Sequence, residues 1–413
     1  MAVAPLNSQL HITGLGEEIA ALANLPWEKP LEEWPEDPNL TAQRGISRHV
    51  VRLVRSTPDP ESEIYAVKET VEEFAVREYE ALKELGARGA PSVSQIAIVN
   101  GRISPDGEEL PCAIVTRFLP YSLPYRVVLS GDVTQHEITN MANALAYLLV
   151  RLHLLGFWWG DCSLSNTLFR RDADGFAAYL VDAETGEFQK NLSNGQREHD
   201  LDLARFNVAA ELEDLKLAGV LFPAMDPIRA SESVITRYRK IWKALSEPQV
   251  LPANDRHAVE RAMRSLQDIG FAVEEVDLQL AGDNSTLTFT PKLVAPNYHS
   301  LRLKELMGLD TEEFQAKRIL ASFDRFRSRE ISRTPDKNEA AQRWLDEVFY
   351  KVVKSVPSQL EGRVEDAQLF HEVLEHRWYL GEKAGADVGL ENATQDYVDS
   401  VLPFRLDSGA PSL

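Results

Sequence analysis

The chain has 413 residues, of which 44% are hydrophobic and 26% are charged, a composition typical of a folded globular protein and not of a disordered one. This length exceeds one ordinary hydrophobic core and predicts two or three domains. The 64 acidic and 44 basic side chains give a formal net charge of −20, which disfavours nucleic acid and anionic membranes as general partners.

The cysteine content and the hydropathy pattern indicate the compartment. Cys112 and Cys162 are the only cysteines, too few for a disulfide framework and typical of a reducing environment. No apolar run approaches the ~20 residues that cross a bilayer. Residues 1–7 lack a cationic segment followed by an apolar one, so no secretory signal is predicted. We therefore expect a cytoplasmic protein without a membrane span.

Residues 1–44 are acidic and are predicted to form an N-terminal arm. The apolar run at 19–22 indicates one short helix within it. Trp27 and Trp34 are expected to pack the arm on the body of the protein, and not to take part in chemistry.

The next elements are predicted in the order strand, strand, helix, strand, strand. A Pro-rich turn at 57–60 separates the first two strands, which is the pattern of a hairpin. The helix has apolar residues at helical spacing and is expected to end at Gly86. The predicted ranges are 49–54, 63–68, 70–86, 94–99 and 112–119.

The remainder of the chain is predicted to be mostly helical. Apolar residues at helical spacing indicate a long helix at 134–155. An alternating stretch at 271–278 reads as a strand, with 287–293 as its hairpin partner. The other predicted helices are 200–217, 234–245, 254–270, 301–306, 311–328, 338–354 and 364–382.

The segment Gly160-Asp161-Cys162-Ser163-Leu164-Ser165-Asn166 carries the most specific chemical signal, with Asp182 at the end of an apolar strand sixteen residues later. In kinases, one aspartate accepts the proton of the attacking hydroxyl, while an asparagine and a second aspartate hold Mg²⁺ on the nucleotide phosphates. An Asp-x4-Asn spacing is common by chance, but here it follows a Leu-His-x2-Gly segment and precedes two strands. The pattern predicts Asp161 as the base, and Asn166 and Asp182 as metal ligands.

Lys68 ends an apolar strand, the place where a kinase carries the lysine that bridges the α- and β-phosphates of ATP. Such a lysine alone is most often a surface residue, but an acid-rich helix follows it immediately. Glu78 is the predicted ion-pair partner, because leucines four and seven residues later would place it near the lobe interface. Glu73 and Glu80 are the alternatives.

On these residues, the stretch from about 45 to 215 resembles the protein-kinase-like superfamily, in the style of lipopolysaccharide-core sugar kinases and aminoglycoside phosphotransferases. The full chain also resembles an uncharacterised bacterial family that joins a kinase-like part to a C-terminal domain of unknown function. The resemblance implies an α+β, two-lobed kinase-like fold followed by a mostly helical domain with a small β hairpin. The expected parts are a small lobe at 45–120, a large lobe at 121–229 and the C-terminal domain at 230–413.

The sequence departs from that family's usual motifs. No Gly-x-Gly-x-x-Gly motif precedes Lys68, and Ser47 and Arg48, with local backbone amides, are the candidate phosphate contacts there. Trp159 and Gly160 replace the usual histidine and arginine before Asp161, which argues against an ordinary protein kinase with an activation-loop switch. Glu184 follows the second aspartate and is expected to be a solvated loop acid, with a metal-ligand role as the alternative.

Three further groups favour structural roles. His199, Asp200, Asp202 and Arg205 either support the catalytic loop or, as we favour, cap a helix. Cys162 lacks an evident histidine partner and is expected to be a small loop residue. His371 and His376 are five residues apart, so their directions on a helix diverge by about 140° and do not match a zinc protease.

The sequence therefore predicts ATP- and Mg²⁺-dependent transfer of a phosphoryl group to a hydroxyl of a small molecule or glycan. Two alternatives stay open: transfer of AMP to protein side chains, and a pseudokinase whose C-terminal domain binds a protein partner. The degenerate glycine loop favours the pseudokinase, and the complete set of Lys68, Asp161, Asn166 and Asp182 opposes it. The acceptor and the oligomeric state are not predicted.

Overall fold

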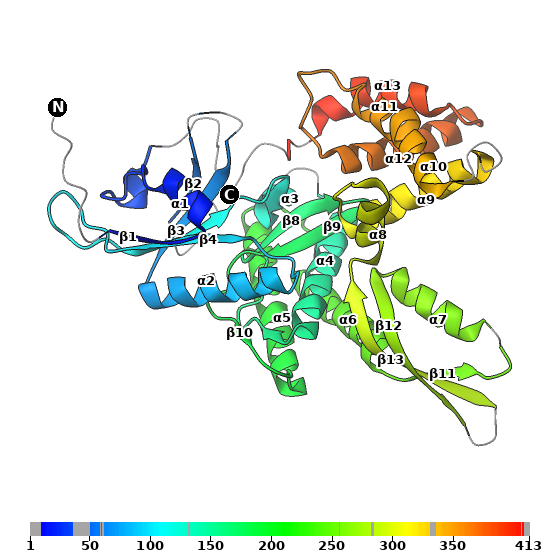
Figure 1. Ribbon diagram of the computed structural model, residues 1–413, viewed down its shortest axis with the longest axis horizontal. Coiled ribbons are helices and arrows are strands. Elements are labelled where there is room, and N and C mark those ends of the chain that lie inside the picture. The colour runs from blue at the N-terminus through cyan, green and yellow to red at the C-terminus, as the bar shows by residue number, and fades with distance from the viewer. Residues whose placement is uncertain are drawn as a thin grey trace. The chain divides into compact units, whose positions relative to one another are not determined.

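The computed structural model describes residues 10–35, 50–57, 59, 62–130, 133–255, 257–281, 285–330, 336–405 and 407–408. These residues fall into two compact units (Figure 1). Their combination of helices and antiparallel sheets confirms the predicted α+β fold class. Unit 1 takes the described residues of Met1–Arg170 and Ala178–Arg237, and unit 2 takes those of Arg171–Ala177 and Tyr238–Gly409. The four domain bounds inferred from the sequence stay a prediction.

A five-stranded antiparallel sheet forms the first part of unit 1. Its strand order is β1-β4-β5-β3-β2. The strands are β1 (His11–Gly14), β2 (Val51–Arg55), β3 (Ile64–Thr70), β4 (Gln95–Asn100) and β5 (Cys112–Arg117). Helix α2 (Glu72–Ala87) packs on β4 and β5, where Tyr79 joins Ile98 and Ile114 in a buried cluster. The predicted order strand, strand, helix, strand, strand is confirmed, and it places Lys68 in β3, between β5 and β2.

The N-terminal arm contributes β1, which the sequence does not predict. This four-residue strand is held by backbone pairing with β4, a long-range contact without a local sequence signal. Helix α1 (Gly16–Leu22) matches the predicted short helix, and a 3₁₀ turn, η1 (Leu31–Glu33), follows. The Trp27 and Trp34 rings lie 5.0 Å apart in the core beneath the sheet, which confirms their packing role.

The part of unit 1 that follows the five-stranded sheet contains two long helices and several short elements. Helix α4 (Gln135–Leu154) begins with a reciprocal cap between Thr134 and Glu137, and its apolar face is buried, as its periodicity predicts. Helix α5 (Asn194–Leu217) begins with the same kind of cap between Ser193 and Gln196. The shorter elements are β6 (Ser122–Pro124), α3 (Tyr125–Val128), β7 (Phe157–Trp158), β8 (Thr167–Asp172), β9 (Gly175–Leu180) and β10 (Glu187–Phe188). Strand β8 lies between β6 and β9, and β7 pairs with β10.

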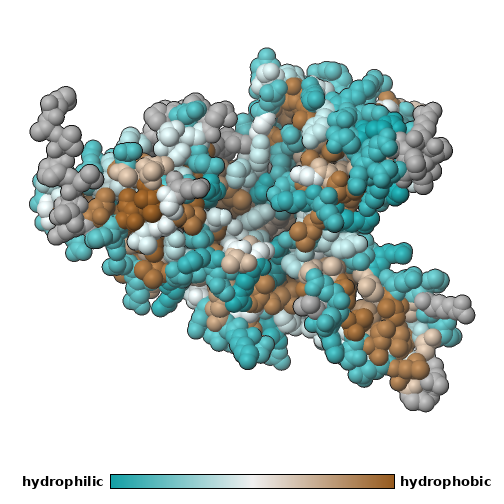
Figure 2. Space-filling view, in the orientation of Figure 1, coloured by the Kyte–Doolittle hydropathy of each residue, from teal (hydrophilic) through white to brown (hydrophobic). Residues whose placement is uncertain are grey.

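Unit 2 opens with a three-stranded antiparallel sheet. Helix α6 (Pro227–Ser246) leads into it from unit 1. The order is β11-β13-β12, and helix α7 (Ala258–Gln267) packs on β12. The strands are β11 (Gln249–Pro252), β12 (Phe271–Leu280) and β13 (Thr286–Pro296), so the predicted hairpin is present and β11 is an addition. Figure 2 shows hydrophobic residues gathered over this sheet, where Val250, Leu278 and Leu280 are exposed.

The remainder of unit 2 is helical and has an aromatic core. The fully buried Trp344 contacts the rings of Phe323, Phe349 and Phe370, with centroids 5.4–6.4 Å away. The elements are α8 (Tyr298–Met307), α9 (Glu313–Glu330), α10 (Lys337–Trp344), a π-helical turn η2 (Leu345–Phe349), α11 (Tyr350–Val353), α12 (Asp366–Ala384), α13 (Leu390–Ser400) and η3 (Leu402–Phe404). Helix α13 is the one long element here that the sequence does not predict. Among the described residues, no helix combines the length and apolarity that crossing a membrane requires.

Candidate functional site

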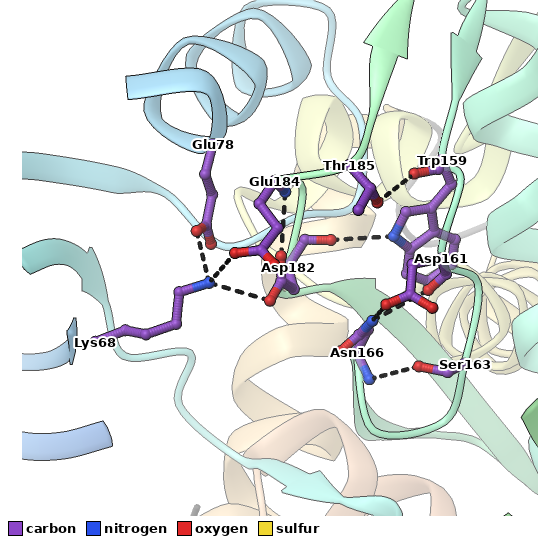
Figure 3. A network of polar contacts seen from close by, with 9 residues as sticks. All are labelled: Lys68, Glu78, Trp159, Asp161, Ser163, Asn166, Asp182, Glu184 and Thr185. Carbon is purple, nitrogen blue, oxygen red and sulfur yellow. Dashed lines mark hydrogen bonds and ion pairs between the residues drawn. The ribbon is translucent and has the colours of Figure 1, made fainter. Parts of the chain in front are cut away.

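Lys68 in β3 is surrounded by three carboxylates (Figure 3). Its Nζ atom lies 2.6 Å from Glu78 Oε2, 3.0 Å from Asp182 Oδ2 and 3.5 Å from Glu184 Oε2. The side chains of Lys68 and Glu78 are only 14% and 3% exposed, so water screens these ion pairs weakly. The structure therefore brings together three residues that the sequence singles out: Lys68, Glu78 and Asp182.

The choice of Glu78 over its neighbours follows from the direction of α2. Glu78 lies on the buried face of the helix, next to Tyr79. Glu73 and Glu80 lie on the exposed face, where they pair with Arg77 and Lys83. Of the three candidates, only Glu78 contacts Lys68.

The charges of this cluster are unbalanced, because three carboxylates share one ammonium group. Burial lowers the pKa of Lys68, but Glu78 and Asp182 outweigh burial, and the net effect raises its pKa. Burial raises the pKa of Glu78, an effect that Lys68 opposes and Asp182 reinforces. An excess of negative charge on oxygen donors is the environment that a hard divalent cation such as Mg²⁺ prefers.

Glu184 belongs to the cluster, so its description as a solvated loop acid is wrong. Its side chain is 21% exposed and its carboxylate reaches Lys68. Its backbone N–H donates to Asp182 Oδ1 (3.1 Å), a turn that brings the two acids together. Glu78, Asp182 and Glu184 each offer a carboxylate oxygen, and these atoms lie within 4.8 Å of one another. This donor set fits a divalent cation.

Asp161 and Asn166 form a second polar group on the loop between β7 and β8 (Figure 3). Asn166 Nδ2 donates to Asp161 Oδ2 (2.9 Å) and to the Asp161 carbonyl (3.1 Å). Asn207 of α5 donates to the other carboxylate oxygen of Asp161 (3.3 Å). Two amides thus orient the carboxylate of Asp161. Because the Asn166 nitrogen is engaged, its amide oxygen is the atom left to serve as a metal ligand.

Asp200 holds the same loop from behind. It is fully buried and accepts hydrogen bonds from the backbone N–H of Trp159 (2.9 Å) and Gly160 (2.8 Å). His153 Nε2 lies 3.0 Å from the same carboxylate. Asp200 lies inside α5, whose N-cap is Ser193, so the helix-cap interpretation is wrong and the loop-support alternative fits.

Trp159 links the loop of Asp161 to that of Asp182. Its indole N–H donates to the Asp182 carbonyl (3.0 Å), and its own carbonyl accepts from the Thr185 hydroxyl (2.9 Å). Gly160 has φ +76°, and a Cβ atom there would lie 3.2 Å from the Thr185 carbonyl. This tight left-handed turn explains why a glycine precedes Asp161.

Asp200→Ala is expected to lower stability. It would leave the N–H groups of Trp159 and Gly160 unpaired in the interior, at about 1–3 kcal/mol for each orphaned group. We therefore expect a lower Tm, which thermal unfolding measures. Asp202→Ala, on the exposed side of α5, is the control, and equal Tm values for the two variants would contradict the support role.

Ser47 and Arg48, the candidate phosphate contacts, lie outside the described residues.

Cys162 is completely buried, and burial raises the pKa of its thiol well above the usual value. This environment suits a packed loop residue and not a nucleophile.

Comparison with solved structures gives a limited likeness. A structure described as WaaP in complex with acyl carrier protein matches with 15% sequence identity and a TM-score of 0.35. The match covers 63% of this chain and 99% of that one. No curated protein matches the chain.

Comparison with family models divides the chain in two. Residues 240–402 match a model described as a domain of unknown function (DUF4032). Residues 63–218 match the model of the lipopolysaccharide kinase (Kdo/WaaP) family, and this range contains Lys68, Asp161 and Asp182. The chain thus joins a region similar to lipopolysaccharide kinases to a region similar to a family of unknown function.

Proposed function

We propose that this protein is an ATP- and Mg²⁺-dependent phosphotransferase that acts on a hydroxyl group of a glycan or small molecule. The observation that carries the proposal is the paired arrangement of Lys68 with Glu78 and Asp182. A loop in the same unit orients Asp161 through Asn166. The match to the lipopolysaccharide kinase family supports a sugar hydroxyl as the acceptor class.

Lys68 is the proposed phosphate-binding residue. The ion pair with Glu78 would keep its ammonium in place, so that it meets the α- and β-phosphates with little reorganisation. Lys68 also contacts Asp182 and Glu184. When phosphates take that position, Glu78 would remain its partner. Ser47 and Arg48 are proposed to add phosphate contacts.

Asn166 and Asp182 are the proposed ligands of Mg²⁺, with Glu184 as a further carboxylate donor. When bound, the metal would neutralise charge on the β- and γ-phosphates. The carboxylates of Asp182 and Glu184 would then exchange their contact with Lys68 for this cation.

Asp161 is the proposed base. The acceptor oxygen would attack the γ-phosphorus, the bond from that phosphorus to the β,γ-bridging oxygen would break, and ADP would leave. The proton of the acceptor hydroxyl would pass to Asp161. The amides of Asn166 and Asn207 would fix the direction of its carboxylate, as in-line attack demands.

Product analysis tests this proposal. The purified protein is incubated with Mg²⁺, ATP labelled in the γ-phosphate, and a panel of glycans and small alcohols, followed by mass spectrometry. Transfer of phosphate with release of ADP is expected, and Lys68→Met, which removes the ammonium at similar length, should abolish it. A gain of AMP on protein side chains would instead identify AMP transfer, and absence of nucleotide binding would identify a pseudokinase.

A further inference from the structure

The two candidate metal ligands, Asn166 and Asp182, lie at the two ends of one β hairpin. Asn166 directly precedes β8, and Asp182 follows β9 after a single residue, Val181. The base of the hairpin is closed by a hydrogen bond from the Val181 N–H to the Asn166 carbonyl (3.1 Å). The geometry of the hairpin therefore sets the separation of the two ligands.

The tip of the same hairpin, Arg171–Ala177, belongs to unit 2. Asp172 is 3% exposed, and its two carboxylate oxygens accept from the backbone N–H groups of Gln315 (2.7 Å) and Phe314 (3.1 Å). These donors lie in the first turn of α9, where helix N–H groups lack partners inside the helix. Asp172 thus caps a helix that begins about 140 residues further along the chain.

Two buried glutamines hold the backbone of the tip. Gln315 donates to the Arg171 carbonyl (2.9 Å), and Gln368 of α12 donates to the Ala173 carbonyl (3.1 Å). Gln315 also donates to the side-chain oxygen of Gln368 (3.1 Å), so the hydrogen bonds of the two glutamines form one network. Ala173 has φ +53°, a left-handed conformation that a residue with a Cβ atom keeps only when its surroundings enforce it.

We propose that Asp172 is a positioning residue, which fixes the β8–β9 hairpin by capping α9 and so sets the metal affinity of Asn166 and Asp182. The inference rests on the proposed function. A paired, buried polar network has one low-energy arrangement, so the tip is held in a single position. Mg²⁺ demands near-ideal octahedral geometry, so a small change in the spacing of its ligands weakens binding.

Calorimetric titration of ATP, with Mg²⁺ and with EDTA, tests this role in the full chain. Asp172→Ala should reduce the gain in ATP affinity that Mg²⁺ provides by about tenfold, while affinity in EDTA stays that of wild type. Asp172→Asn keeps one acceptor oxygen, so its gain in ATP affinity from Mg²⁺ should lie between that of wild type and that of Asp172→Ala. The matched control is Asp336→Ala, because Asp336 caps α10 with the same chemistry, away from the hairpin.

Amide hydrogen exchange of residues 166–182 shows whether each variant has loosened the hairpin. Faster exchange in Asp172→Ala with an unchanged Mg²⁺ effect would overturn the inference and leave the proposed function intact. Absence of a Mg²⁺ effect in wild type would instead overturn the proposed function. If Asp172→Ala does not fold, Arg318→Ala replaces it, since Arg318 is half-exposed and bonds Asp174 in the tip (2.8 Å). A smaller loss of the Mg²⁺ effect is then expected. Faster exchange with an unchanged Mg²⁺ effect would again overturn the inference, and absence of a Mg²⁺ effect in wild type would again overturn the proposed function.

Discussion

An Asp182→Ala variant is expected to lose the Mg²⁺-dependent part of ATP binding. Asp182 follows β9, and its carboxylate is held by Lys68 on one oxygen and by the Glu184 N–H on the other. Removing this carboxylate takes a principal oxygen ligand from the proposed metal site, while Lys68 keeps Glu78 as its partner. We expect the Kd for ATP in Mg²⁺ to rise at least about tenfold, ~1.4 kcal/mol, toward the value in EDTA. Calorimetry with and without Mg²⁺ measures both constants.

Two further variants sharpen this result. Asp202→Ala removes an exposed acid of α5 and should leave both constants unchanged. Glu184→Ala should weaken the Mg²⁺ effect less than Asp182→Ala, because Glu184 is only a further donor beside the two proposed ligands. If wild type binds ATP with Mg²⁺ and Asp182→Ala does so equally well, Asp182 is not a metal ligand.

Strands β2–β5 and helix α2 could be predicted from sequence because their signals are local. Their periods appear directly in the sequence, and the observed bounds lie close to the predicted ones. Lys68 lies in a strand, Asp161 and Asn166 lie in a tight loop, and Asp182 follows a strand. Their spacing together with the flanking segments makes them candidates. Glu78 could be preferred over Glu73 and Glu80 because the helical period relates its direction to that of the buried leucines.

The remaining parts depend on contacts between distant segments. Strand β1 exists through its pairing with β4, and four residues carry no periodic signal. The residue type of Asp200 favours a helix cap, but the tertiary structure buries it against the N–H groups of Trp159 and Gly160. Glu184 follows Asp182 in a loop, and only the turn between them shows that both face Lys68. Spacing along the chain does not encode these directions.

The β8–β9 hairpin also depends on contacts that the sequence does not reveal. Its two strands can be predicted from the sequence itself, but the contacts of its tip cannot. The partners of its tip, Gln315 and Gln368, lie more than 140 residues away, in helices whose periodicity explains their folding without reference to the hairpin. An aspartate in a hairpin turn reads as a local turn residue. Only the fold shows that Asp172 caps α9.

A large loss of activity with little change in ATP binding is expected for Asp161→Asn. The carboxylate of Asp161 is held by Asn166 Nδ2 and Asn207 Nδ2, so both of its oxygens act as acceptors and are directed by fixed amides. An asparagine cannot take the proton of an attacking hydroxyl, and the loss of a positioned base typically lowers a rate by about 10²–10⁴-fold. Because Lys68, Glu78 and Asp182 are untouched, the Kd for ATP with Mg²⁺ should stay within about threefold of wild type. Single-turnover transfer of labelled phosphate measures the rate, and calorimetry measures binding.

The new amide also meets the amide of Asn166, so the variant loses one hydrogen bond, about 0.5–1.5 kcal/mol, and its Tm should be recorded beside its rate. Asn207→Ala separates the two effects, because it removes the bond to Asp161 Oδ1 and keeps the base. That variant should lose stability and lose less than about tenfold in rate, ~1.4 kcal/mol. Asp202→Asn makes the same chemical change on the surface of α5 and should leave rate, binding and Tm unchanged. Transfer undiminished in Asp161→Asn would remove Asp161 from the mechanism, while equal losses in Asp161→Asn and Asn207→Ala would reduce its role to that of a loop support.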